Sequence, residues 1–137
     1  MENSKSETLN PKQYQNTNSQ NPKKYDLEER TLKFAKDVRE FIKILPKSIS
    51  NYEDCKQLSR SSGSIGANYI EANESLSRKD FVMRVKISRK EAKESTFWLN
   101  LIDLGNSNND LITKRGLLIK EAMELTKIFG AIVEKSK

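Results

Sequence analysis

The sequence of 137 residues contains no histidine and one cysteine, Cys55. Without histidine the chain has no imidazole acid or base, which excludes Ser-His-Asp triads, Cys-His dyads and Cys/His zinc clusters. A single cysteine cannot form an intrachain disulfide, a usage typical of proteins in reducing compartments. We therefore expect a protein that is not an enzyme and has neither a cofactor nor a bound metal ion.

Long apolar runs are also absent from the sequence. No stretch approaches the ~18 residues that a membrane span requires, and the first residues lack the apolar segment of a signal peptide. We therefore expect a cytoplasmic protein without a membrane partner. The hydrophobic residues, 35% of the total, suffice for one lean core, and the length allows one folded domain.

The first 24 residues differ in composition from the rest of the chain. Asn, Gln, Ser, Thr and Lys dominate this segment, which also contains Pro11 and Pro22. It cannot bury enough apolar surface to offset an ordering entropy of roughly 1–2 kcal/mol per residue. We predict a disordered polar tail over residues 1–24 and a folded domain over 25–137. The tail carries +2 of the formal charge of +6, so the folded domain carries the other +4.

Four segments of the predicted domain place apolar or small residues at alternating intervals of four and three, which is the period of one helix face. No segment alternates Val, Ile or Thr with the period of a strand. The sequence therefore predicts an all-α fold, an antiparallel up-down-up-down four-helix bundle. The four faces are Leu27, Thr31, Phe34, Val38, Phe41 and Leu45; Leu58, Ser62, Ile65, Tyr69, Ala72 and Leu76; Phe81, Val85, Ser88, Ala92, Ser95, Leu99 and Ile102; and Leu111, Arg115, Leu118, Ala122, Leu125, Phe129 and Ile132.

Polar and special residues mark the predicted helix ends. Ser50 with Glu53 has the form of a capping box, and Pro46 cannot continue the first helix. Gly105 stands where a left-handed C-terminal cap would end the third helix. The expected N-caps are Asp26, Ser50, Ser77 and Asn109.

The middle of the second predicted helix is crowded with small residues. A glycine disfavours helix by about 1 kcal/mol, so this composition makes sense where another helix backbone approaches closely. Gly63 and Gly66 have the spacing of an RNA-clamping loop, but their place inside a continuous helical stripe favours a helix. The small residues are Ser59, Ser61, Ser62, Gly63, Ser64, Gly66 and Ala67.

The third predicted helix carries a second stripe, displaced about 100° from its core face. The stripe is either the edge of a wide core, covered by Trp98, or a subunit interface, where tryptophan is favoured. We favour an interface formed by Ile87, Trp98 and Leu101, in which the first and third helices self-associate. The whole stripe is Arg84, Ile87, Glu91, Glu94, Trp98 and Leu101.

Carboxylates and the lone thiol allow two further interpretations. Carboxylate metal sites in helical bundles use Glu-x-x-His motifs, which a chain without histidine cannot form. We expect Glu71, Glu91 and Glu94 to pair with Arg or Lys or to face solvent. Cys55, near the start of the second helix, has no partner base and is expected to be an ordinary thiol.

Basic residues provide the most definite chemistry. On the third helix they lie opposite the core stripe, on a face shared with Met83 and Phe97. They are either a solvated surface or a surface that attracts polyanions, and oligomerisation would concentrate their charge. The candidate nucleic-acid-binding residues are Lys79, Lys86, Lys90 and Lys93 on the third helix and Lys36, Arg39 and Lys43 on the first.

Several motifs occur together in an order that resembles a known family. The family is the bacterial four-helix bundle family of 23S rRNA-intervening sequence proteins, which also includes the accessory variability determinant proteins of diversity-generating retroelements. The resemblance extends over Asp26 to Lys137. Its motifs are Asp26-Leu27, Arg30-Thr31, Phe34-Ala35, Val38, Phe41, Leu45-Pro46, Gln57-Leu58, Arg60-Ser61, Ser64-Ile65-Gly66-Ala67-Asn68 with Glu71-Ala72, Ser77 with Asp80-Phe81, Lys90-Glu91-Ala92 with Glu94, and Trp98-Leu99.

This resemblance implies a ring-like homopentamer without enzymatic activity and without catalytic residues. Members encoded in ribosomal RNA insertions have no settled function, whereas the retroelement members are basic and bind a reverse transcriptase and nucleic acid. We predict a basic oligomer that binds RNA, DNA or a nucleic-acid enzyme such as a reverse transcriptase as an accessory factor, with no small-molecule substrate. The alternative is a structural or scaffold oligomer with protein partners only.

Overall fold

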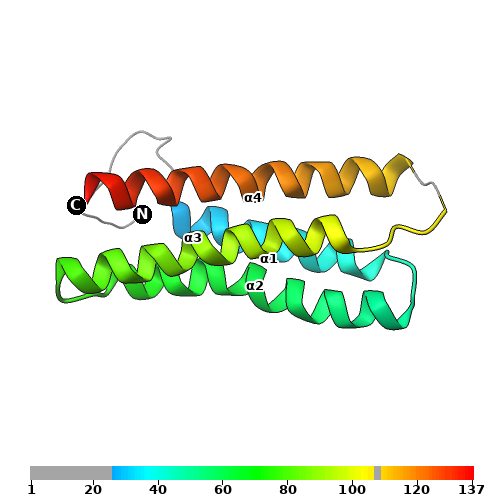
Figure 1. Ribbon diagram of the computed structural model, residues 1–137, viewed down its shortest axis with the longest axis horizontal. Helices are drawn as coiled ribbons and strands as arrows, with labels where there is room; N and C mark the ends of the chain where they lie inside the picture. The colour runs from blue at the N-terminus through cyan, green and yellow to red at the C-terminus, as the bar shows by residue number, and fades with distance from the viewer. Residues whose placement is uncertain (1–25, 107–108) are drawn as a thin grey trace. The chain divides into compact units, whose positions relative to one another are not determined.

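The computed structural model describes residues 26–106 and 109–137, which form four α-helices and no strand. The helices are α1 (Leu27–Lys43), α2 (Ile49–Asn73), α3 (Arg78–Leu101) and α4 (Asn109–Lys135) (Figure 1). The all-α prediction is confirmed.

The chain divides into two compact units, Met1–Arg30 and Thr31–Lys137. Of the first unit the structure describes residues 26–30, where Asp26 Oδ1 accepts a hydrogen bond from Glu28 N at 3.0 Å, as expected of an N-cap. The predicted tail over 1–24 lies outside the described residues. The contacts described below lie within the second unit.

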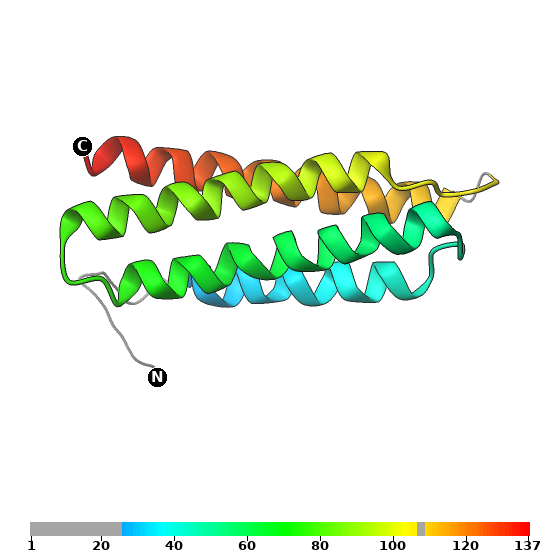
Figure 2. The ribbon, with the colours of Figure 1, turned by 60° about the horizontal axis from the view of Figure 1, so that its bottom comes forward.

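Neighbouring helices of the second unit run antiparallel. As residue numbers rise along one helix, the numbers of their partners fall along the next, and the ribbon reverses direction between α1 and α2 and between α2 and α3 (Figure 2). The defining pairs are Thr31 with Gly66 and Arg39 with Ser59 between α1 and α2, Asn51 with Asp103 and Asn68 with Arg84 between α2 and α3, and Arg78 with Ser136 and Ile102 with Arg115 from α3 to α4.

The predicted core faces are buried along most of their length. Val38, Leu58 and Leu125 have no exposed surface, and the ring of Tyr69 lies 5.6 Å from that of Phe129 between α2 and α4. The prediction for Leu76 is wrong, because α2 ends at Asn73 and Leu76 is fully exposed. The helix stops three residues before the expected end of the stripe.

Serines fill the contact between α2 and α3. Ser61, Ser88 and Ser95 are fully buried there, whereas Ser62, which is also fully buried, accepts a hydrogen bond from Arg39 of α1 at 3.4 Å. Ser61 Oγ lies 2.9 Å from Ser95 Oγ, and Ser88 Oγ donates to the backbone oxygen of Ile65 at 2.9 Å. A side chain that reaches the backbone of the neighbouring helix requires the two helices to be close. The small residues therefore serve close helix approach, as the sequence predicts.

Two of the expected helix ends are misplaced. Ser48, not Ser50, caps α2, because its Oγ accepts the hydrogen bond from Asn51 N at 3.1 Å. Gly105 has the expected positive φ of 76° but does not cap α3, which ends at Leu101 with Ile102 as its C-cap. The N–H of Gly105 donates a hydrogen bond to Asp103 Oδ1, so this left-handed residue shapes the loop that follows α3. Ser77 caps α3 as predicted, and α4 begins at Asn109, the expected cap itself.

Candidate nucleic-acid interface on the third helix

The positive charge of the described residues is concentrated on α3. This helix carries seven Lys and Arg residues against three Asp and Glu residues. Helices α1 and α4 each carry five basic and four acidic residues, and α2 carries two basic and three acidic residues. The surplus predicted for the folded domain therefore lies mainly on one helix.

The four predicted basic residues of α3 are all exposed: Lys79, Lys86, Lys90 and Lys93. They lie on the side of α3 opposite its buried residues Val85, Ala92 and Leu99. None of the four lysines forms an ion pair with another described residue. Their ammonium groups are free to meet an anion from solution.

A shallow, open depression on α3 brings three of these lysines together. It is lined by Lys86, Arg89, Lys90, Lys93, Glu94 and Phe97. Lys79 is not among the lining residues, although sequence reasoning grouped it with the other lysines. Arg89 is a lining residue that sequence reasoning missed, although its position three residues after Lys86 and four before Lys93 carried the signal.

The stem of Arg89 lies beside α4 at the side of the depression. The residue is half-buried, and its Cδ lies 3.8 Å from the position that a Cβ on Gly130 would take. A side chain at residue 130 would therefore reach ordinary contact with the arginine stem. The arginine stem therefore lies beside α4, with room for a methyl group at residue 130.

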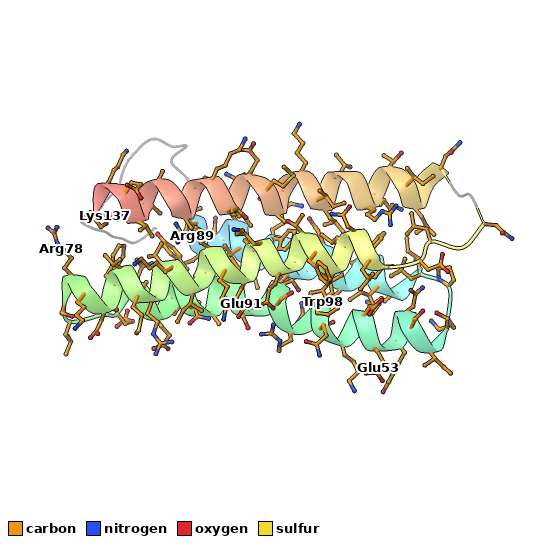
Figure 3. The ribbon with its side chains drawn as sticks, viewed as in Figure 1. Glu53, Arg78, Arg89, Glu91, Trp98 and Lys137 are labelled. Atoms are coloured by element: carbon orange, nitrogen blue, oxygen red, sulfur yellow. The ribbon has the colours of Figure 1, made fainter. Side chains whose placement is uncertain are left out.

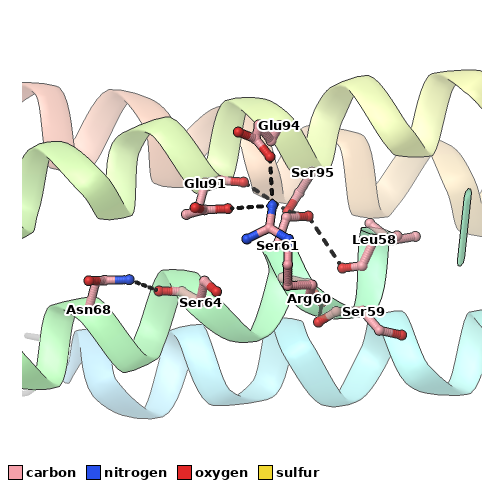
Figure 4. A network of polar contacts seen from close by, with 10 residues as sticks. Leu58, Ser59, Arg60, Ser61, Ser64, Asn68, Glu91, Glu94 and Ser95 are labelled. Carbon is pink, nitrogen blue, oxygen red and sulfur yellow. Dashed lines mark hydrogen bonds and ion pairs between the residues drawn. The ribbon is translucent and has the colours of Figure 1, made fainter. Parts of the chain in front are cut away.

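The acidic residue of the depression is paired with a cation from outside it. Arg60 of α2 lies between two glutamates of α3, with Nη2 2.7 Å from Glu94 Oε1 and 3.2 Å from Glu91 Oε1 (Figure 4). One guanidinium thus serves two carboxylates, and the three groups together keep a net charge of −1. The four cations that line the depression have no ion-pair partner among the described residues.

Glu91 is buried beside this pair. Its side chain is 8% exposed, and Oε1 is within ion-pair distance of Arg60 but has no aligned hydrogen-bond donor among the described residues. The contact with Glu91 contributes most to raising the pKa of Arg60 above its ordinary value, while burial opposes it. The expectation that Glu91 and Glu94 pair with a basic residue is confirmed, and Glu71 faces solvent.

The basic residues predicted on α1 do not line the depression. Arg39 donates hydrogen bonds to Ser59 O at 3.1 Å and Ser62 Oγ at 3.4 Å, so its guanidinium joins α1 to α2. Lys43 pairs with Glu40 at 2.8 Å, and Lys36 is exposed.

The residues predicted for a subunit interface lie along α3 beside the depression. Ile87 and Trp98 are half-buried, and Leu101 is 50% exposed. Trp98 Nε1 is buried without a hydrogen-bond acceptor among the described residues. Figure 3 shows Trp98 on the same side of α3 as Glu91. Its ring meets that of Phe97 edge to face, with centroids 5.0 Å apart and planes at 81°.

Comparison with known proteins places this helical domain in a family. Residues 23–129 match the 23S rRNA-intervening sequence protein family. The chain belongs to that family. The sequence resemblance to 23S rRNA-intervening sequence proteins is thus confirmed, although the further relationship to retroelement proteins is not part of this match.

One similar solved structure of this kind comes from Bacteroides thetaiotaomicron. It is described as a protein with unknown function from the S23 ribosomal protein family. The two chains are 29% identical, the TM-score is 0.67, and the match covers 79% of this chain and 98% of the other. No curated protein matches the chain. This chain and the solved member of the S23 ribosomal protein family therefore have the same type of fold.

The described part of this 23S rRNA-intervening sequence protein was also compared with the requirements of a metal site, a membrane span and a reactive thiol. No group of three His, Cys, Asp or Glu residues there is placed to hold a metal ion, and none of the described helices is long and apolar enough to span a membrane. Cys55 is half-buried, and burial raises the pKa of its thiol above the ordinary value. A raised pKa lowers the thiolate fraction at neutral pH, which is typical of an unreactive thiol.

Proposed function

We propose that this protein is a non-enzymatic oligomeric module that binds nucleic acid through the depression on α3. The observation that carries the proposal is the charge arrangement. Four cationic side chains line one open surface against a single acidic residue, Glu94, which shares the guanidinium of Arg60 from another helix with Glu91. The depression therefore presents an excess of positive charge to a polyanion.

Phosphate groups are the anions best suited to such a surface. Lysine ammonium groups on flexible stems bind phosphates as point charges and release condensed counterions into solution. In a plot of log binding constant against log salt concentration, each neutralised phosphate makes the slope more negative by ~0.7 for single strands and ~0.9 for duplex DNA. Three or four contacts from the depression thus correspond to a slope of roughly −2 to −4. The lysines contact the backbone rather than base edges, so we expect binding to tolerate any sequence.

Self-association through α3 is the second element of the proposal. Trp98 Nε1 is buried without an acceptor, and exposed Leu101 extends the same stripe. Trp98 Nε1 is closed off within one chain, so it is the half-exposed ring of Trp98 and the exposed Leu101 that a second copy packed on this stripe would cover. A homopentamer would repeat the depression in each subunit, and linked sites raise the overall affinity well above that of one site.

The proposed partner is RNA or DNA in the cytoplasm, alone or held by a nucleic-acid enzyme such as a reverse transcriptase. The relationship to accessory variability determinant proteins belongs to this proposal and is supported by the basic α3. A scaffold oligomer with protein partners only is the second candidate. The interface stripe around Trp98 favours it independently of charge, because its apolar residues suit a protein surface.

Fluorescence anisotropy titrations with labelled RNA and DNA at two salt concentrations test the proposal. The test variant is Lys86→Glu/Lys90→Glu/Lys93→Glu, and we expect it to lose binding while its helical circular dichroism stays unchanged. The matched control is Lys120→Glu/Lys127→Glu/Lys135→Glu, which makes the same charge change at exposed positions of α4. We expect the control to keep more affinity than the test variant.

Two outcomes would contradict nucleic-acid binding at this site. Equal losses in both triple variants would mean that net charge matters and the depression does not. Absence of wild-type binding at low salt would refute the function and leave the scaffold oligomer as the better candidate. A wild-type affinity that does not respond to salt would contradict the electrostatic mechanism even if binding were observed.

A further inference from the structure

Phe97 is an apolar residue in a cationic depression. It lies one helical turn after Lys93, and 59% of its surface is exposed. A phenylalanine so exposed loses most of the stabilisation that burial would give it. Much of the ring surface therefore remains available to a ligand.

The ring of Phe97 is held in place by its neighbour. Trp98 packs against it edge to face at 5.0 Å, the geometry favoured by aromatic quadrupoles. Trp98 is itself half-buried. This contact favours the observed orientation of the ring, in which 59% of the residue is open to a ligand.

We propose that Phe97 is a stacking platform for an unpaired base and that the depression therefore prefers single-stranded over double-stranded nucleic acid. The inference rests on the proposed function, because the lysines supply the phosphate contacts. Base–aromatic stacking adds affinity for any base, since every base has a flat π-face. In a duplex these faces are covered by neighbouring base pairs, so only the phosphates reach the depression.

The spacing along α3 matches this division of labour. Lys86, Lys90 and Lys93 cover about 10 Å of the helix, and Phe97 follows about 6 Å further on. A strand whose phosphates lie along the lysines thus carries its next base toward the ring. Arg89 adds a planar guanidinium group to the same surface.

Charge also argues against a protein partner at this ring. The centres of protein interfaces are depleted of charged residues, whereas three lysines and Arg89 line the depression that contains Phe97. Burying these side chains under another protein would require an acidic partner for each. A nucleic acid brings phosphates and flat bases together in one chain.

Titrations of the full chain with three labelled ligands of equal length test the proposal. The ligands are a single strand, its duplex, and an abasic single strand that keeps the phosphates but lacks the bases. The variants are Phe97→Leu, which keeps an apolar side chain without a π-face, and Phe97→Trp, which keeps the aromatic face. Wild type should bind the single strand more tightly than the abasic strand by a factor of roughly 5 to 150 per stacked base.

Phe97→Leu should lose most of that factor for the single strand and leave the duplex and the abasic strand within about twofold of wild type. Phe97→Trp should retain the preference. Since Phe97 lies close to Trp98, light scattering on each variant shows whether the assembly is intact. A mass change in Phe97→Leu would overturn the proposal by making the ring a subunit contact.

The remaining results separate this inference from the proposed function. If the lysine triple variant loses binding but Phe97→Leu binds every ligand like wild type, the function stands and the stacking platform is refuted. Equal affinity of the wild type for the single strand and the abasic strand would likewise refute the stacking platform and leave the proposed function standing. If wild type binds none of the three ligands at low salt, both the function and the inference fail.

Discussion

Gly66 allows the close approach of α1 and α2 to be measured as a free energy. A Cβ added at this position would lie 2.7 Å from Thr31 Oγ1 and 3.1 Å from Thr31 Cβ. Carbon atoms in contact prefer about 3.5–4.0 Å. Thr31 is 1% exposed and β-branched, so its side chain has little freedom to turn away. The helices themselves would have to separate.

For Gly66→Ala two effects of opposite sign compete. Alanine improves helix propensity by about 1 kcal/mol over glycine. Inserting a methyl group into a packed contact costs roughly 1–3 kcal/mol. We therefore expect a net loss of about 0–2 kcal/mol in the free energy of unfolding.

Gly116→Ala is the matched control, because nothing lies within 4 Å of the added Cβ at that position of α4. It should gain stability by about 0.5–1 kcal/mol from propensity alone. The difference between the two variants isolates the packing cost. A difference of 1–3 kcal/mol corresponds to melting temperatures roughly 3–15 °C apart for a domain of this size.

Thermal unfolding followed by circular dichroism measures this difference, and urea titrations convert it to free energies. Adding Thr31→Ala should make Gly66→Ala less costly, since the Oγ1 contact is then absent. If Gly66→Ala stabilises the protein as much as Gly116→Ala, the close contact between α1 and α2 at this level is wrong. Equal costs in the wild-type and Thr31→Ala backgrounds would place the strain elsewhere.

Three further predictions concern the interface, the buried glutamate and the thiol. Trp98→Glu should dissociate the oligomer in light scattering, because an unpaired buried charge costs several kcal/mol; a wild-type chain already monomeric at tens of micromolar would disprove the proposed assembly. Arg60→Ala should lower the free energy of unfolding by roughly 1–3 kcal/mol in urea titrations. This is less than the ~3–5 kcal/mol of fully buried pairs because Arg60 is 48% exposed, and the added Glu91→Gln change should restore part of the loss. Cys55 of the folded protein should react with iodoacetamide at pH 8 more slowly than in the unfolded chain, because burial raises the pKa of the thiol. The protonated thiol therefore contributes to stability in full below the pKa of the unfolded chain, and this contribution is lost as the pH rises through the pKa of the folded protein. Equal alkylation rates in folded and unfolded protein would contradict that shift.

The fold was largely predictable because helical periodicity is a property of local sequence. Stripes such as Val85, Ala92 and Leu99 depend only on the helical repeat, and these residues are buried. The choice of cap was less predictable: Ser48 and Ser50 are both good N-caps, and the path of the chain after Pro46 decides between them. The small residues around Gly66 predicted that another helix backbone approaches closely there. That the residue it meets is Thr31 could not be predicted, because it depends on the register between α1 and α2.

The candidate site was predictable only in part, for a related reason. The exposure of Lys86, Lys90 and Lys93 follows from their spacing relative to the core stripe. The ion pair of Arg60 with Glu94 joins residues 34 positions apart, so it depends on how α2 and α3 align. The position of the Arg89 stem beside Gly130 likewise depends on the contact between α3 and α4.

The serine contact between α2 and α3 has a consequence for the energetics of ligand binding. The hydroxyls of Ser61 and Ser95 meet on one side of the helix whose other side carries the lysines. A shift of α3 along α2 would break the bond between Ser61 and Ser95 and take the buried Ser88 hydroxyl away from its acceptor, the backbone oxygen of Ile65. The backbone beneath the depression is therefore already ordered before a ligand arrives. Binding then costs the rotamer entropy of the cationic side chains rather than the entropy of a rearranging helix. The heat capacity change on binding should accordingly be small, in contrast to that of a segment that folds on its partner.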